Sequence, residues 1–189
     1  LDHPWVYHFN NIILYGLTCV LILLTLQRLF RSKFEGQYAW LTIPFIATLL
    51  FTAHPIHTEV VANIKGRDEI LGMLGSIATL YLAIRYIDTD KIGYLLATLP
   101  VFILAILSKE NAITFLAVIP LAYYFFSRNF KLSKALLVAA PLVAGVGIYF
   151  LIRNANLPKI DIESKTYEIL NDPFAFSNTA DRLATVAFT

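Results

Sequence analysis

Two short polar segments contain most of the side chains in this chain that could do chemistry. They are residues 54–59, HPIHTE, and residues 108–111, SKEN. His54 and His57 are three positions apart, and the carboxylate of Glu59 follows, so the first segment could hold a metal ion. The same imidazoles could instead cap a helix end at a membrane interface or contact a substrate or lipid phosphate. No third firm metal ligand is specified, and we expect Glu59 to be a weak candidate for acid or base catalysis.

A third polar segment, residues 66–69, GRDE, comes directly before an apolar stretch. One interpretation is structural, because Asp68 and Glu69 in the first turn of a helix interact favourably with the helix dipole. The other is functional, because the guanidinium of Arg67 can hold a phosphate through two parallel hydrogen bonds. The sequence leaves both interpretations open.

Lys109 and Glu110 occupy a connection so short that it must lie at a membrane surface. They could form a local ion pair, which contributes little when it is exposed. Charged groups at membrane depth are expensive and often functional, so Lys109 could equally meet the phosphate of a membrane lipid.

The elements that position these segments are apolar helices. The chain has 189 residues, of which 58% are hydrophobic and 15% charged, and its mean hydropathy is +0.66. A soluble domain is about half apolar and about a quarter charged. Six stretches without charged residues have lengths close to the roughly 20 residues that a helix needs to cross a bilayer. Their apolar residues do not alternate with polar ones as in a membrane strand. We predict an all-α, polytopic membrane helical bundle over residues 1–152, with helices near 9–29, 38–53, 69–87, 91–107, 111–127 and 133–152.

Composition excludes several other classes. The net charge of +2 argues against a nucleic-acid binder. The single cysteine, Cys19, excludes an internal disulfide and a multi-cysteine zinc site. We expect residues 153–189 to form a non-cytoplasmic loop that leads into a further helix, and the chain to be a piece of a longer protein.

Basic residues divide the polar segments into two sets. The loops near 28–38, 85–91 and 128–134 contain only three acidic residues, Glu35, Asp88 and Asp90, and their basic residues are Arg28, Arg31, Lys33, Arg85, Lys91, Arg128, Lys131 and Lys134. Short basic loops are typically cytoplasmic. The motif segments and all four histidines, His3 and His8 among them, belong to the other set. We therefore predict that the motif loops are non-cytoplasmic.

In this order, the motifs resemble the transmembrane and tetratricopeptide-repeat O-mannosyltransferases and their bacterial relatives, which are polytopic glycosyltransferases of the GT-C class. The most specific elements are His-Pro-x-His-Thr-Glu and Ser-Lys-Glu. At Tyr15 that family usually has a histidine, and at Asp172 an asparagine. The resembling stretches are residues 7–14, 54–61, 66–68, 107–112, 172–175 and 182–185.

The resemblance implies a membrane enzyme that moves a sugar, mannose-like, from a polyprenyl-phosphate donor to a hydroxyl of a secreted or lumenal polypeptide. It implies that His54, His57, Arg67, Asp68, Lys109 and Glu110 bind substrate or lipid phosphate, and that the main catalytic acid lies upstream of Leu1. It leaves a divalent metal open as a cofactor, and other membrane subunits open as partners. The family's repeat domain would follow Thr189.

Two other functions compete with this interpretation. A non-catalytic membrane scaffold of a larger complex could keep the same fold, and an acidic pair in an external loop before Leu1 would favour the enzyme over it. A transporter ranks lowest, because transporters place charged or broken-helix elements near the bilayer midplane. No Asn-x-Ser/Thr site occurs. We therefore expect a bacterial inner membrane rather than the endoplasmic reticulum.

Overall fold

A computed structural model describes residues 4–30, 42–127 and 129–156, and this region of the chain is helical and contains no strand. The prediction of an all-α fold is thereby confirmed. Two 3-10 turns, η3 (Ile64–Gly66) and η4 (Glu110–Thr114), interrupt the helices. The helices are α1 (Pro4–Leu29), α2 (Ile43–Ala53), α3 (His57–Ala62), α4 (Arg67–Thr89), α5 (Ile92–Ser108), α6 (Phe115–Phe126) and α7 (Leu132–Asn156).

Three of these helices are long and apolar enough to cross a membrane. They contain Trp5–Leu29, Arg67–Thr89 and Leu132–Ala155. The shorter apolar helices are Ile43–Ala53, Ile92–Ser108 and Glu110–Phe126. Six crossings stay a prediction, since residues 38–41 of the second expected helix lie outside the described residues. Chain contacts separate residues 1–155 from 156–189, and residues 157–189 are likewise not described.

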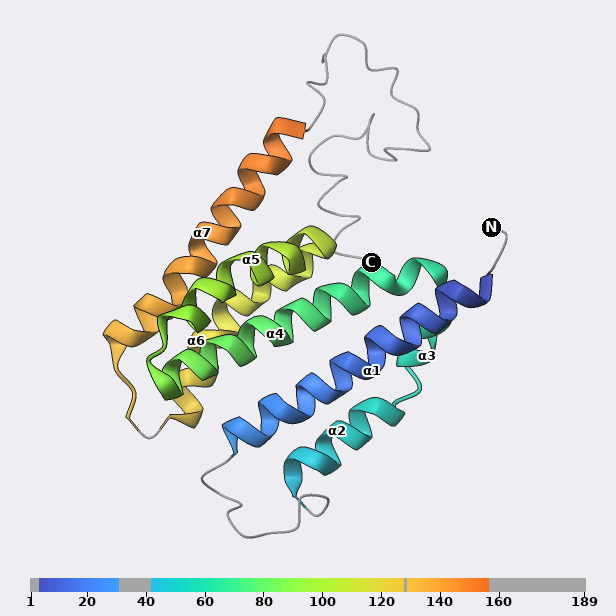
Figure 1. Ribbon diagram of the computed structural model, residues 1–189, viewed down its shortest axis with the longest axis horizontal. Coiled ribbons are helices and arrows are strands. Elements are labelled where there is room, and N and C mark those ends of the chain that lie inside the picture. The colour runs from blue at the N-terminus through green and yellow to red at the C-terminus, as the bar shows by residue number, and fades with distance from the viewer. Residues whose placement is uncertain (1–3, 31–41, 128, 157–189) are drawn as a thin grey trace, which may run out of the picture. The chain divides into compact units, whose positions relative to one another are not determined.

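Helix α4 is the central element of the packing. It lies between α1 and α5, and it also contacts α6 (Figure 1). Arg67, at the start of α4, contacts Asn11, near the start of α1. Asp88, near the end of α4, pairs with Arg28, near the end of α1. Helices α1 and α4 therefore run in the same direction, so the two ends of the described bundle carry different residues.

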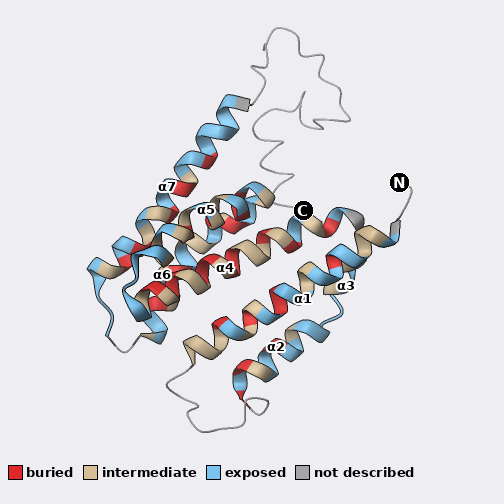
Figure 2. Cartoon of the chain, viewed as in Figure 1, coloured by how far each residue is buried: buried red, intermediate tan, exposed pale blue. Residues whose placement is uncertain are grey.

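Apolar side chains fill the interior and also cover much of the outside. Phe102, Ile106, Ile119, Val138 and Leu142 are buried between the helices. Figure 2 shows long exposed stretches on α1, α2 and α7, where the exposed large side chains include Leu17, Leu24, Leu50, Leu136 and Leu151. So much exposed apolar surface is typical of helices that face lipid.

Buried hydroxyl groups in the helices are satisfied within their own helix. Thr18, Thr48, Ser76 and Thr79 each donate a hydrogen bond of 2.7–2.8 Å to the carbonyl four residues earlier. No water is needed to satisfy these donors, as a membrane interior requires.

Two glycines allow α4 and α5 to approach closely. A Cβ atom built on Gly72 would lie 2.6 Å from Cβ of Lys109, and one on Gly75 would lie 2.7 Å from Cβ of Ala105. Both distances are shorter than van der Waals contact. The absence of a side chain at Gly72 therefore leaves room for the side chain of Lys109 to lie against α4 and reach Asp68 and Glu69.

Candidate functional site

The motif segments meet at one end of the described bundle, which we call the motif end. It is built from the start of α1, the α2–α3 junction, the start of α4 and the end of α5. The contacts that join them span about 40–60 positions of sequence, as between Asn11 and Asn63 or Lys109 and Asp68. Arg28, Asp88, Asp90 and Lys134 form ion pairs at the opposite end, which we call the basic end.

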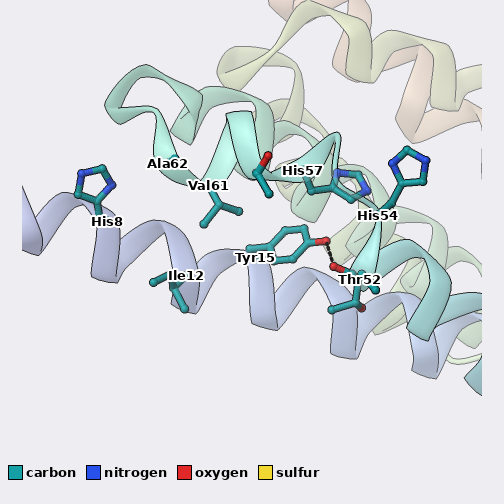
Figure 3. A pocket seen from close by; sticks show the side chains of 10 residues that line it. His8, Ile12, Tyr15, Thr52, His54, His57, Val61 and Ala62 are labelled. Atoms are coloured by element: carbon teal, nitrogen blue, oxygen red, sulfur yellow. Dashed lines mark hydrogen bonds between the residues drawn. The ribbon is translucent and has the colours of Figure 1, made fainter.

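His54 and His57 line a pocket of about 490 Å³ between α1 and the α2–α3 junction (Figure 3). We call it the histidine pocket. Most of its exposed wall is apolar, and His8 contributes a third imidazole. Tyr15 occupies the position where the family resemblance would place a histidine. The side chains labelled in the figure are His8, Ile12, Tyr15, Thr52, His54, His57, Val61 and Ala62.

The imidazole of His57 is held by aromatic neighbours. Its ring centroid lies 4.3 Å from that of Phe51 and 5.5 Å from that of Tyr15. The Tyr15 hydroxyl donates a 3.1 Å hydrogen bond to the Thr52 carbonyl, which fixes the tyrosine against the end of α2. No carboxylate of the described residues pairs with His57, so its ring nitrogens stay available to a ligand.

His54 has a second, structural role. Its Nδ1 accepts a 3.3 Å hydrogen bond from the backbone N–H of Ile56, in the turn that begins α3. The contact orders the turn between α2 and α3, whereas α3 itself has no side-chain cap at its N-terminus. Its ring centroid lies 6.0 Å from that of His57, so both imidazoles stand at the same side of the pocket (Figure 3).

Glu59 lies on a different face of α3 from His57. The pocket wall includes His57, Thr58, Val61 and Ala62 of this helix but not Glu59. The Glu59 side chain is exposed and forms no hydrogen bond or ion pair with any other described residue. Its carboxylate is therefore free, but the structure does not bring it together with the imidazoles inside the pocket.

Asn11 connects α1 to the motif segments and is fully buried. Its Nδ2 donates to the carbonyl oxygens of Val61 and Asn63, at 3.3 and 3.0 Å. Its Oδ1 lies 3.5 Å from Nε of Arg67, whose guanidinium also stacks over the Tyr7 ring at 5.4 Å. The two carbonyls belong to the end of α3, and that of Asn63 also accepts a hydrogen bond from the Gly66 N–H of η3, so Asn11 fixes this junction against α1.

Lys109, Asp68 and Glu69 form a group that we call the lysine cluster. The Lys109 Nζ lies 3.2 Å from Oδ2 of Asp68 and 2.5 Å from Oε1 of Glu69. Hydrogen bonds donated to Glu69 and then to Asp68 raise the pKa of Lys109, so the ammonium group stays charged. The cluster joins α5 to the first turn of α4 and carries one net negative charge.

Glu110 does not pair with Lys109. Its Oε1 instead accepts hydrogen bonds from the Tyr149 hydroxyl at 2.7 Å and from Arg153 at 2.8 Å. The hydrogen bond from Tyr149, followed by the charge of Arg153, lowers the pKa of Glu110. Of the two interpretations that the sequence left open, the local ion pair is not formed, because Lys109 and Glu110, at the break between α5 and η4, pair with different helices.

The metal interpretation of His54 and His57 finds no ligand set here. Across the residues that the structure describes, no three side chains of His, Cys, Asp or Glu gather closely enough to hold an ion. Asp68 and Glu69 are directed to Lys109, away from the imidazoles.

Sequence reasoning did not select five residues that the structure places around the candidate site. They are Asn11, Tyr15, Glu69, Tyr149 and Arg153. A polar residue inside a long apolar stretch is a usable signal, and it applies to Asn11 and Tyr15. Tyr149 and Arg153 had no such signal, because they resemble an ordinary helix end at an interface.

The all-helical architecture and the apolar outer surface define an integral membrane protein. The chain belongs to the dolichyl-phosphate-mannose-protein mannosyltransferase family, PMT_2, whose model matches residues 2–152. The predicted family resemblance is confirmed by this match.

Individual relatives agree with the family. The chain is 32% identical to human protein O-mannosyl-transferase TMTC1, over 70% of this chain and 15% of the relative. It is 28% identical to Caenorhabditis elegans protein O-mannosyl-transferase F38B6.6, over 92% of this chain and 22% of the relative. Mouse protein O-mannosyl-transferase TMTC3 is 31% identical, over 76% and 15%. The chain thus spans less than a quarter of these relatives, and no solved structure matches it.

Proposed function

We propose that this chain forms part of a membrane glycosyltransferase that moves a mannose-like sugar from a polyprenyl phosphate to a hydroxyl group of a polypeptide. The reaction joins the acceptor oxygen to the anomeric carbon of the sugar and breaks the bond from that carbon to the phosphate. The lipid phosphate leaves with the electron pair, and the acceptor hydroxyl gives its proton to a base.

The histidine pocket is the observation that carries this proposal. Its walls are mainly apolar, which suits an isoprenoid chain, whereas His54 and His57 present imidazole edges at one side. Imidazole N–H groups are suitable donors to a phosphate that gains negative charge as it leaves. Because no carboxylate of the described residues pairs with His57, it can turn a ring nitrogen to a ligand without breaking an ion pair there.

The other motif residues have supporting roles in this proposal. Arg67 and Asp68 hold the start of α4 against α1 and α5, through Asn11 and Lys109. Lys109 and Glu110 connect α5 to α4 and α7, and their charges are already matched by protein groups. Glu59 is a candidate base on the exposed face of α3. We propose that the principal catalytic acid belongs to a region of the longer protein that precedes Leu1.

The predicted sidedness supports a reaction outside the cytoplasm. Contacts bring the histidines and the Ser-Lys-Glu segment to the motif end, while Arg28 and Lys134 pair at the basic end. Since short basic loops are retained in the cytoplasm, a secreted or lumenal polypeptide is the proposed acceptor. We propose a bacterial inner membrane as the location, from the absence of Asn-x-Ser/Thr sites.

A transfer assay tests the proposal. Membranes containing the chain in its full reading frame are incubated with a radiolabelled polyprenyl-phosphate mannose and a peptide rich in serine and threonine. We expect label in the peptide, and a loss of about 100-fold in His57→Ala, the scale for removing one donor to a developing charge. Lys91→Ala, at the basic end, is the control and should keep the wild-type rate.

A non-catalytic scaffold remains the alternative, and one observation favours it. The charges of the Ser-Lys-Glu segment are paired with protein groups within the described residues, as expected of a structural element. If the protein is a scaffold, the wild-type protein will transfer no label to the peptide, even with the donor and the peptide in excess. If the wild-type protein transfers label and His57→Ala does so at the same rate, the role of the histidine pocket is rejected but the enzyme activity is not.

A further inference from the structure

A second pocket, with no place in the proposed reaction, lies at the basic end. It has a volume of about 720 Å³ and lies where α4 and α6 end and α7 begins. More than half of its exposed wall is polar, in contrast to the histidine pocket. We call it the basic-end pocket, and six of its residues matter here: Asp88, Asp90, Ser127, Lys131, Ser133 and Lys134.

The two carboxylates of this pocket are already neutralised. Asp88 pairs with Arg28 at 3.1 Å, and Asp90 pairs with Lys134 at 2.5 Å. Lys134 is additionally fixed by a 2.8 Å hydrogen bond to the Ile87 carbonyl. Neither aspartate therefore presents an unmatched negative charge to a ligand in the pocket.

Lys131 supplies the surplus positive charge. Its side chain is exposed, and its ammonium group pairs with no carboxylate of the described residues. Its backbone is held in place, because the Lys131 N–H donates a 3.1 Å hydrogen bond to the Tyr123 hydroxyl. Ser127 and Ser133 also line the pocket, so Lys131 and two residues with hydroxyl groups border the same cavity.

Exposed apolar side chains line the pocket or follow its lining residues in sequence. Leu137 and Phe130 line it, Leu137 is 52% exposed, and Leu132, next to Lys131 in the chain, is exposed as well. Tyr124 and Phe125, at the end of α6, are also exposed, as in the aromatic belt of a membrane interface. A ligand here would have its anionic group at the polar wall and apolar chains along α6 and α7.

We infer that the basic-end pocket binds the phosphodiester headgroup of an anionic phospholipid. Basic pockets between membrane helices on the cytoplasmic side are suited to such headgroups. The phosphate would contact the Lys131 ammonium and the serine hydroxyls, and the acyl chains would follow Leu137 and Leu132. The inference does not depend on the proposed transfer reaction, because it concerns the opposite end of the bundle.

Native mass spectrometry of the purified full-reading-frame protein tests this site with phosphatidylglycerol and phosphatidylcholine as probes. We expect retained phosphatidylglycerol in preference to phosphatidylcholine. Lys131→Ala should weaken this preference about fivefold, the effect of one basic residue near an anionic surface. Lys91→Ala removes the same charge at the same end but outside the pocket, and should change the preference less than about twofold.

A pair of uncharged variants makes the test independent of surface charge. Leu137→Trp fills the pocket, whereas Leu136→Trp enlarges an exposed neighbour on α7 that does not line it. We expect only Leu137→Trp to reduce the retained phosphatidylglycerol. If the two lysine variants, or the two tryptophan variants, lose the same amount of phosphatidylglycerol, the lipid is attracted to the surface in general and the site is overturned. Displacement of the lipid by millimolar inorganic phosphate would overturn the lipid as ligand in favour of a free anion.

Discussion

The histidine pocket and the lysine cluster lie at the same end of the bundle, but they use their polar groups differently. In the pocket, His57 packs between Phe51 and Tyr15 and has no charged partner among the described residues. In the cluster, two carboxylates of α4 surround the ammonium of Lys109. The pocket offers the ring nitrogens of His57 to a ligand, whereas the ammonium of Lys109 is already paired with two carboxylates of the protein.

This difference assigns separate tasks to the two most specific sequence motifs. The His-Pro-x-His-Thr-Glu segment lines a mainly apolar cavity, whereas the Ser-Lys-Glu segment joins helices across the end of the bundle and lines a mainly polar cavity. A positively charged residue in a membrane-enzyme motif is therefore not necessarily a phosphate ligand. The partners that the fold supplies decide which role it takes.

The largest expected effect separates the two regions directly. We expect His57→Ala to lower sugar transfer about 100-fold. Lys109→Met, which keeps the length and packing of the side chain, should lower it less than tenfold, because Lys109 acts through position. Rates from the two variants are compared at equal membrane expression. Equal losses would mean that the lysine cluster also contacts the substrate.

The next effect concerns the contact that holds the lysine cluster in place. Gly72→Ala puts a Cβ atom 2.6 Å from Cβ of Lys109 and should lower the free energy of unfolding by about 1–3 kcal/mol. Gly93→Ala is the matched control, since nothing lies within 4 Å of the added atom. Thermal unfolding in detergent measures both. A Gly72→Ala protein as stable as the control would show that α5 can move away without cost.

A smaller effect is expected where α1 supports the histidine pocket. Asn11→Ala removes the buried amide that donates to the carbonyls of Val61 and Asn63, of which Asn63 keeps the Gly66 N–H, and this costs about 1–2 kcal/mol. Local opening of α3 should then increase, so its amide hydrogens should exchange about tenfold faster. Asn10→Ala changes an exposed neighbour and is the control. Unchanged exchange in α3 would contradict the role of Asn11.

The smallest effect is a dependence of stability on pH at Glu110. The fold lowers the pKa of Glu110, so it favours the charged carboxylate. This contribution is complete above the ordinary glutamate pKa of about 4.3 and is lost as pH falls through the lowered pKa. Melting temperatures of wild type and Glu110→Gln, measured from pH 6 downward, should therefore converge in acid. A constant difference between them would contradict the pairing with Tyr149 and Arg153.

The helical class and the grouping of the motif residues could be predicted from the sequence. Long charge-free stretches define helices by length alone, and the alternation of basic and motif loops predicted two sets of polar segments. The contacts of Arg28 with Asp88, and of Lys109 with Asp68, keep those two sets separate. The alternation of basic loops with motif loops can be seen in the sequence, because it depends only on the order of the loops along the chain.

Individual partners could not be predicted in the same way. Lys109 and Glu110 are neighbours in sequence, yet the break between α5 and η4 sends them to α4 and α7. The buried Asn11 is some 50 positions away from the carbonyls it binds. Such choices depend on helix rotation and on the space that residues like Gly72 leave, and no local pattern specifies either.

The side chain of Lys109 in the space above Gly72 also limits how this bundle can change shape. A one-turn shift of α5 along α4 would carry the Lys109 ammonium away from Asp68 and Glu69 and would separate both ion pairs. We therefore expect α4 and α5 to move together as one rigid unit. If the proposed donor requires a wider pocket, we expect α2 and α3 to move, because α1 retains them through the hydrogen bonds of Asn11 and Tyr15.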